Sequence, residues 1–348
     1  MKKKEVVVYK DDAFYSAFPC VEKLAGNELA VIFRRAPQRK PYSDHLDSES
    51  AAVLVRSKDG GNKWGIPEIV YKKEYAVQDP SIRQLKDGTL ISSFFQWKVV
   101  KEHPFNHSTI GTFILRSFDN GKQWEKNAFR IDAPAYKSVD ISEPVLELPD
   151  GELLIPLYGN RDVFVMRSKD KGRTWGDLAM IGRDPFRNLW FCEPTLCMTK
   201  SGKILCMIRE ESAYATQRGN FLFQSESLDG GKTWSLPYKT DIWGHPANLL
   251  TLSDGRILVT YGYRRPPYGV RGCISEDEGK TWKLKDEIVI RSDGLHGDLG
   301  YPSSVELSPN KILTVYYFHT GKPVNKDSYG HYSHSGGIRY IAGSFYEV

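Results

Sequence analysis

The sequence has little of what marks a membrane, disulfide or metal protein. Its apolar runs stay far below the roughly 20 residues of a membrane-spanning helix, so we expect no membrane partner. The apolar residues 6–8 behind the basic start are too few for a signal-peptide core, which predicts a cytoplasmic protein, or an extracytoplasmic one if the natural chain starts earlier. Five cysteines without CxxC spacing predict buried, reduced thiols. The eight histidines show no HExxH or zinc spacing, so no metal site and no cofactor are expected.

Excess charge and helical periodicity are also scarce. The 48 Lys and Arg against 43 Asp and Glu leave a net charge of only +5 over 348 residues. Nucleic-acid binding usually needs a concentrated basic face, so no nucleic-acid partner is predicted. The 40% of apolar residues excludes a disordered chain. At roughly 150 residues per domain the length suggests two domains, but all-β folds run longer as one.

The pattern Ser-x-Asp-x-Gly-x-x-Trp occurs five times. Its copies begin at Ser57, Ser117, Ser168, Ser227 and Ser275. A short Asp can accept backbone N–H bonds and a Gly can take positive φ, so each copy predicts a hairpin turn that the Trp covers. We therefore interpret the five Asp residues as structural.

A second pattern occurs six times and consists of a Pro, an apolar stretch, a turn and another apolar stretch. The prolines are Pro19, Pro80, Pro144, Pro194, Pro246 and Pro302. Two apolar stretches around such a turn indicate a β-hairpin. Each unit then has about four strands, and six units predict an all-β, six-bladed β-propeller, with residues 1–348 as one domain. The sixth unit lacks the Ser-Asp-Gly-Trp pattern, so we expect the N-terminal EVVVYK strand to complete the last blade and close the ring.

These repeats resemble the sialidase superfamily, where the five-fold motif is called the Asp box or BNR repeat, over essentially the whole chain. The resemblance implies that the boxes lie on the outer rim and that the active site lies at the centre. The residues just before the six prolines differ in chemistry, which is typical of a ligand-facing ring; a set of solvated channel residues is the alternative. They are Phe18, Asp79, Glu143, Glu193, His245 and Tyr301.

The resemblance also assigns catalytic roles. Tyr301 matches the sialidase nucleophile, and Glu193 matches the base that activates it. A phenol is a poor nucleophile at pH 7, so a neighbouring carboxylate must take its proton. Arg209 and Arg271 match arginines that bind the substrate carboxylate through a planar fork. Asp44 is the best match for the acid/base carboxylate; its rivals on the same loop are Asp47 and Glu49.

One family residue is missing. Sialidases open with Phe/Tyr-Arg-Ile-Pro, and the corresponding stretch here, Tyr15-Ser16-Ala17-Phe18-Pro19, has the proline but no arginine. Arg34 or Arg35, at the end of the next strand, could reach the centre instead. Further substrate-binding candidates are Asp79, Glu143, His245 and Arg265, the last of which follows another arginine, Arg264.

The sequence therefore predicts an exo-acting glycoside hydrolase that resembles exo-α-sialidases and cleaves a terminal anionic sugar from a glycan. Two alternatives stay open. One is a non-sialidase hydrolase or lyase on uronic-acid or rhamnose-type glycans, with His245 or His319 as an acid/base group. The other is a non-catalytic propeller that binds a glycan or a protein.

Overall fold

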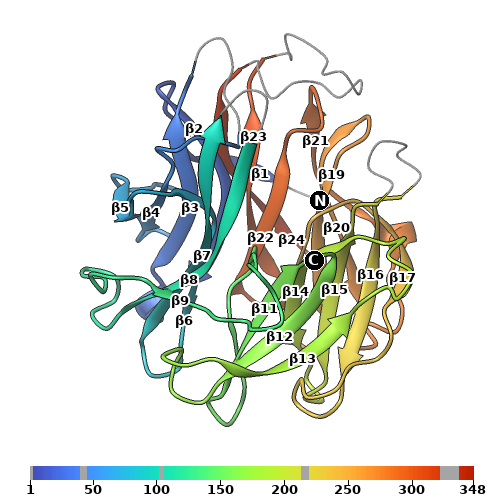
Figure 1. The fold of residues 1–348 in the computed structure, drawn as a ribbon. Helices are drawn as coiled ribbons and strands as arrows, with labels where there is room; N and C mark the ends of the chain where they lie inside the picture. The colour runs from blue at the N-terminus through green and yellow to red at the C-terminus, as the bar shows by residue number, and fades with distance from the viewer. Residues whose placement is uncertain (1–2, 40–44, 102–105, 213–218, 322–336) are drawn as a thin grey trace.

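The structure is a computed structural model that describes residues 3–39, 45–101, 106–212, 219–321 and 337–348. Within these ranges the strands form six antiparallel sheets of four strands each. Figure 1 shows the sheets arranged in a ring, with the first blade in blue beside the last blade in red. The predicted all-β, six-bladed propeller is confirmed.

Blades one to five each consist of four strands that are consecutive in the chain. Blade one contains β2 (Phe14–Lys23), β3 (Leu29–Pro37), β4 (Ala51–Ser57) and β5 (Glu68–Tyr71). Blade two contains β6 (Ala76–Gln84), β7 (Leu90–Lys101), β8 (Asn106–Ser117) and β9 (Phe129–Arg130). Blade three contains β10 (Leu146–Glu147), β11 (Leu153–Gly159), β12 (Asp162–Ser168) and β13 (Gly176–Gly182). Blade four contains β14 (Phe191–Met198), β15 (Ile204–Glu210), β16 (Phe221–Ser227) and β17 (Tyr238–Trp243). Blade five contains β18 (Ala247–Thr251), β19 (Ile257–Tyr263), β20 (Tyr268–Ser275) and β21 (Ile288–Gly294).

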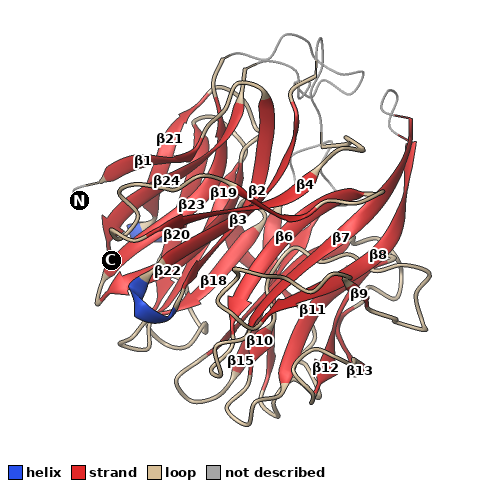
Figure 2. Ribbon diagram, turned by 90° about the vertical axis from the view of Figure 1, so that its left-hand side faces the viewer, coloured by secondary structure: helices blue, strands red, loops and turns tan. Residues whose placement is uncertain are grey.

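The last blade combines both ends of the chain. Its strands are β22 (Gly300–Ser308), β23 (Lys311–His319), β24 (Arg339–Glu347) and the N-terminal β1 (Lys4–Tyr9), which pairs with β24. Figure 2 shows the two ends of the chain close together, as does Figure 1. The predicted closure by the N-terminal strand is therefore confirmed, and it removes the unpaired edge that β24 would otherwise present.

Apolar side chains fill the wedges between neighbouring sheets. Val31 and Val53 of blade one pack in one buried cluster with Leu313 and Ile341 of blade six. Both faces of each sheet pack against a neighbouring sheet, so side chains on both sides of a strand are buried. This explains why the strand sequences are nearly continuous apolar runs. Two short 3₁₀ helices, η1 (Ala25–Asn27) and η3 (Leu284–Asp286), lie in connections. In the part of the chain that the structure describes, no helix is long and apolar enough to cross a membrane.

The Asp boxes form the turns between the third and fourth strands of blades one to five. In the first box, Ser57 Oγ donates to Asp59 Oδ1 at 2.9 Å and accepts the Gly61 backbone N–H at 2.8 Å. Asp59 Oδ1 also accepts the Lys63 N–H at 2.9 Å, and the Trp64 indole donates to the Gly61 carbonyl at 3.0 Å. The Ser–Asp and Gly–Ser bonds recur in the four other boxes. These hydrogen bonds hold each Asp carboxylate within its own turn, in agreement with a structural role.

Candidate active site

Four of the six residues that precede the hairpin prolines share an uncommon backbone conformation. They are Phe18, Asp79, Glu193 and Tyr301, with φ of 56°, 41°, 47° and 49°. Each lies at a register shift between the inner strand and its hairpin partner. A bulge of this kind re-aims a side chain, and left-handed non-glycine residues concentrate at functional sites. The bulges therefore give four positions of this ring a shared local geometry, and ligand contact at them stays a prediction.

Tyr301, Glu193 and Arg209 form a buried hydrogen-bonded triangle. The Tyr301 hydroxyl donates to Glu193 Oε1 at 2.5 Å. Arg209 Nη1 lies 2.9 and 2.8 Å from the two Glu193 oxygens and 3.3 Å from the Tyr301 hydroxyl. Arg209 Nη2 donates to Glu211 Oε1 at 2.8 Å. The structure thus brings together three of the residues predicted for the site, and it places a carboxylate where it can take the phenol proton.

The surroundings of Tyr301 keep its phenol protonated. Burial raises the pKa of Tyr301 well above its usual value, and the charges of Glu193 and Asp79 raise it further. Arg209 and Arg264 oppose this effect and lower the same pKa. The Arg264 guanidinium lies 5.5 Å from the centre of the Tyr301 ring. Tyr301 can therefore act as a nucleophile only if its proton moves to Glu193 as it reacts.

Three further carboxyl groups face Glu193 from blades two and three. Burial raises the pKa of Asp79 well above its usual range, that of Asp140 to about 7 and that of Glu143 to about 8. The Glu193 charge contributes to all three shifts. Ser142 Oγ donates to Asp79 Oδ2 at 2.9 Å. Carboxyl groups that hold protons near neutral pH can donate hydrogen bonds to ligand oxygens instead of repelling them.

Arg34 occupies in blade one the place that Arg209 occupies in blade four. Ala17 pairs with Arg34 and Cys192 with Arg209, and each of the two hairpins has its register shift directly after this pair. The Arg34 side chain is fully buried, and its Nη2 donates to the His45 carbonyl at 2.6 Å. Its positive charge also lowers the pKa of Asp79. Arg34 therefore supplies positive charge to a site that lacks an arginine before Pro19.

Arg35 lies on the other face of β3. Its guanidinium is 4.2 Å from the centre of the Phe14 ring, and its Nη1 donates to the Tyr9 hydroxyl at 3.2 Å. Side chains of neighbouring residues in a strand point to opposite faces. Of the two candidates that sequence analysis left open, the structure therefore places only Arg34 beside the central carboxylates.

Arg265 and Arg271 gather around Tyr263 in blade five. The Arg265 guanidinium lies 4.2 Å from the Trp243 ring and donates to the Tyr263 hydroxyl at 2.6 Å. The Arg271 guanidinium stacks 3.4 Å from the centre of the Tyr263 ring, and its Nη1 lies 2.5 Å from Glu287 Oε2. Arg271 and Arg209 thus have different carboxylate partners, and a substrate-binding role for Arg265 or Arg271 stays a prediction.

The two predicted histidines are buried and neutral. Burial, with the charges of Arg209 and Arg264, lowers the pKa of His245 well below its usual value. Burial lowers the pKa of His319 to about 4, and its ring stacks on His296 with centroids 3.6 Å apart. Neither histidine carries the proton that a general acid must hold at neutral pH.

The loop expected to supply the acid/base carboxylate is only partly described. Asp44 lies outside the described residues. Its rivals are both bound by Arg39, at 2.8 Å for Asp47 Oδ2 and 2.7 Å for Glu49 Oε1. Asp47 is buried, whereas Glu49 is exposed. The salt bridges make both carboxylates part of the loop's own structure.

Sequence analysis missed His45 and Asp298. The His45 ring lies 4.9 Å from the Phe18 ring, and His45 Nε2 is 3.3 Å from Asp298 Oδ1. Asp298 also accepts from Tyr317 at 2.9 Å. Only their positions in the sequence could have pointed to them: His45 directly follows Asp44, and Asp298 precedes Tyr301 by three residues. Of the adjacent Arg264 and Arg265, Arg264 is the one that lies beside the Tyr301 ring.

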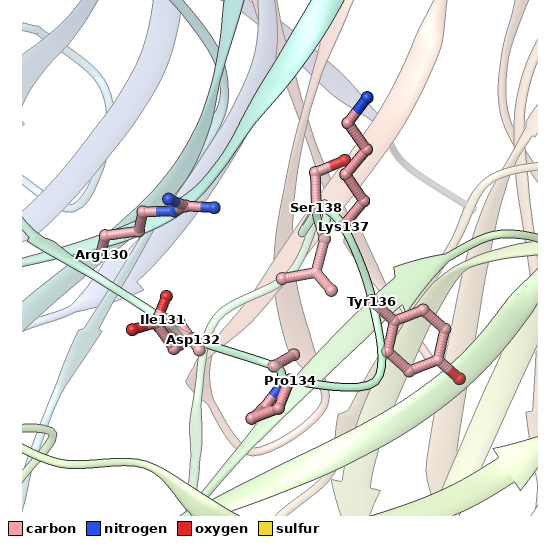
Figure 3. A pocket seen from close by; sticks show the side chains of 9 residues that line it. Arg130, Ile131, Asp132, Pro134, Tyr136, Lys137 and Ser138 are labelled. Carbon is pink, nitrogen blue, oxygen red and sulfur yellow. The ribbon is translucent and has the colours of Figure 1, made fainter.

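A separate pocket lies between blades two and three and is lined by residues 130–134 and 136–139 (Figure 3). Arg130 and Lys137 bring positive charge to it, while the Tyr136 hydroxyl donates to Asp162 at 3.0 Å. None of Tyr301, Glu193 or Arg209 lines this pocket. Among the described residues there is no group of three or more His, Cys, Asp or Glu placed to hold a metal ion. The five cysteines are buried free thiols.

Comparisons with known proteins agree on the fold. The model of a family described as a BNR repeat-like domain matches residues 46–312. No curated protein matches the sequence significantly. A crystal structure of a protein of unknown function from Dyadobacter fermentans is 30% identical, with a TM-score of 0.85 over 99% of this chain and 98% of that one.

Two enzymes share the fold at much lower identity. The NanB sialidase from Streptococcus pneumoniae is 14% identical, with a TM-score of 0.74 over 99% of this chain and 70% of that one. The Penicillium chrysogenum α-L-arabinanase, solved with arabinobiose, is 13% identical, with a TM-score of 0.67 over 99% and 97%. At these identities the likeness concerns the fold alone.

Proposed function

This chain belongs to the BNR repeat-like domain family, within the sialidase superfamily, and from that premise we propose that it is an exo-acting glycoside hydrolase for a terminal anionic sugar. The observation that carries the proposal is the contact of 2.5 Å between the Tyr301 hydroxyl and Glu193 Oε1. Solved structures of the same fold include glycoside hydrolases. Fold alone does not decide activity, so the proposal depends on these side chains.

In the proposed reaction Tyr301 attacks the anomeric carbon while its phenol proton passes to Glu193. Tyrosine nucleophiles are a known exception to the usual pair of carboxylates in glycosidases. Arg209 holds Glu193 through both carboxylate oxygens and stabilises negative charge that develops on the Tyr301 oxygen, 3.3 Å away. Arg34 and Arg264 add positive charge near the same centre, which favours an anionic sugar.

The experiment that tests this proposal is a panel of fluorogenic and chromogenic substrates with Tyr301→Phe as control. The panel includes 4-methylumbelliferyl N-acetylneuraminide and 4-nitrophenyl glycosides of glucuronic acid, rhamnose and arabinose. We expect turnover of an anionic member and a loss of at least about 10³-fold in Tyr301→Phe, because no other group replaces the nucleophile. Activity within tenfold of the wild type in the purified, folded variant would contradict the tyrosyl mechanism.

A second candidate function is favoured by how the arginines are engaged. Both Nη atoms of Arg209 contact glutamates, Arg271 is paired with Glu287, and the stretch before Pro19 has no arginine. A substrate carboxylate would therefore have to share these groups. This arrangement favours a hydrolase on a sugar without a carboxylate, of rhamnose type, and the same panel separates the two functions. Binding of a glycan without turnover by the wild type would support the non-catalytic alternative.

A further inference from the structure

His45 is held at the centre of the propeller by three blades. Its backbone carbonyl accepts from Arg34 Nη2 at 2.6 Å and from Gln78 Nε2 at 2.8 Å. Its ring packs edge-on against Phe18, with centroids 4.9 Å apart, and Phe18 in turn packs against Tyr301 at 4.6 Å. The His45 side chain keeps a quarter of its surface exposed. A ring that is both fixed and reachable from solvent is what proton exchange with a ligand requires.

Asp298 orients the His45 ring. Asp298 Oδ1 lies 3.3 Å from His45 Nε2 and accepts from the Tyr317 hydroxyl at 2.9 Å. Asp298 Oδ2 binds Arg339 Nε at 2.8 Å and Nη2 at 2.7 Å. Asp298 and Arg339 are both almost completely buried. An ionised carboxylate only accepts, so Asp298 fixes the proton on Nε2 and stabilises the positive form of the ring.

We propose that His45 is the acid/base residue of this site and that Asp298 is its positioning residue, an inference that rests on the function proposed above. Two features of the described chain point to this pair. The histidines His245, His296 and His319 are buried, with the positive charge of Arg209 and Arg264 acting on His245 and that of Arg339 on His319. His45 instead contacts a carboxylate and remains partly exposed.

The proposed reaction moves one proton at His45 and one at Tyr301 in each of its two halves. The His45 imidazolium gives its Nδ1 proton to the glycosidic oxygen as the bond from that oxygen to the anomeric carbon breaks, and the bonding electrons stay on the leaving alcohol. The Tyr301 oxygen bonds to the anomeric carbon, and its proton passes to Glu193. In the second half neutral His45 takes a proton from water, the water oxygen displaces Tyr301, and Glu193 returns the phenol proton. Both residues then regain their starting protonation states.

The test compares leaving groups, because an acidic phenol departs without protonation whereas an alkyl alcohol does not. One probe pair is 4-methylumbelliferyl N-acetylneuraminide with 3′-sialyllactose, and the other is 4-nitrophenyl glucuronide with methyl glucuronide. In His45→Gln we expect kcat to fall by about 10²–10³-fold on the alkyl member and by less than tenfold on the aryl member. The variant keeps the backbone carbonyl contacts to Arg34 and Gln78, and thermal unfolding checks that it is folded.

Asp298 is tested through its partner. Asp298→Asn should show the same dependence on leaving group in kcat, with little change in KM, and the double variant His45→Gln/Asp298→Asn should lose little more than His45→Gln alone. A purely structural role of Asp298 would instead give equal losses on both members of a pair. His107→Gln is the matched control, because His107 packs at a tilt against Trp97 in blade two, and its rates should stay within about twofold.

The outcomes separate the two proposals. If the wild type turns over none of the four probes, the proposed function fails and the role of His45 fails with it. If a probe is turned over and Tyr301→Phe abolishes this turnover, but His45→Gln loses equally on both members of the pair, only the role of His45 is overturned. Dependence on leaving group in Asp44→Asn and not in His45→Gln would likewise overturn it and assign the role to Asp44.

Discussion

The outer turns of this propeller repeat the same residues from blade to blade, whereas the starts of the inner strands carry different residues. At five outer turns the same serine, aspartate and glycine make the same two hydrogen bonds. At the six inner starts the chain places a different chemistry in nearly every blade. The serine and aspartate of each outer turn bond within that turn, whereas the inner residues Asp79, Glu143 and Tyr301 have partners in other blades. Uniformity therefore marks what the outer turns of blades one to five need to fold, and we expect variety to mark what the ring as a whole can bind.

The largest effect that would sharpen this contrast is expected from Glu193→Gln. Glutamine is similar in shape but cannot take the Tyr301 proton, so kcat should fall by about 10³-fold. Arg209 would lose one of its two carboxylates in a buried setting, which should lower the free energy of unfolding by about 2–3 kcal/mol. Steady-state kinetics and urea unfolding measure the two effects. Retention of most activity would contradict the difference between centre and rim, because an inner residue would then affect stability alone, as we expect of a rim residue.

A matched pair of neighbours gives the next effect. Arg34→Met should lower kcat/KM by about 10–100-fold, because it removes buried charge beside Asp79 and a donor to the His45 carbonyl. Arg35→Met changes the same residue type one position along and should leave kcat/KM within about twofold, since Arg35 contacts Phe14 and Tyr9. Equal losses in the two variants would show that total charge matters and that position does not.

The raised pKa of Glu143 predicts that the stability of the protein depends on pH. Burial raises its pKa to about 8 in the folded state, above the value near 4.5 of an exposed carboxyl group. A folded-state pKa above the unfolded-state value means that ionisation of Glu143 favours the unfolded chain. The protein therefore has its full stability below pH 4.5 and loses this contribution as the pH rises through 8. Glu143→Gln should remove this loss and be more stable than the wild type at pH 8.5 by roughly 1–3 kcal/mol. Urea unfolding at pH 5 and 8.5 measures it, and parallel pH curves for the two proteins would refute it.

The smallest effect is expected at the rim. Asp170 accepts four hydrogen bonds within its own turn, from Ser168, Arg173 and twice from Thr174. Asp170→Ala should cost about 1–2 kcal/mol of unfolding free energy, as other turn and cap losses do, and leave kcat unchanged. A fall in kcat of more than threefold would show that a rim residue affects activity, which would contradict the division into a structural rim and a functional centre.

Much of the fold could be predicted because its evidence is local. Each Asp box fits in eight residues, and each hairpin shows its proline and its turn, so counting them predicts the blades. Glu193, Arg209 and Tyr301 could also be proposed together, because the resemblance links their segments. The structure adds that they touch.

The remaining site residues depend on register and on ring closure, which the sequence does not display. Arg34 and Arg35 are adjacent and chemically alike, and only the pairing of Ala17 with Arg34 decides which one faces the centre. His45 and Asp298 are 253 residues apart and meet because blade six closes against blade one. Arg271 had a family role to match, but its partner Glu287 follows 16 residues later with no motif to announce it.

The pairing of β1 with β24 also has a consequence for synthesis. Lys4 aligns with Phe345, so β1 can pair with β24 only after all the strands between them have been translated. Until then β1 is an unpaired β-rich segment, and β22 and β23 are an unfinished sheet with an open edge. Ring closure should therefore be a late and slow event, because contacts between residues so distant in sequence form slowly. The wedge between blades one and six, and with it the meeting of His45 and Asp298, would be among the last parts of the molecule to become native.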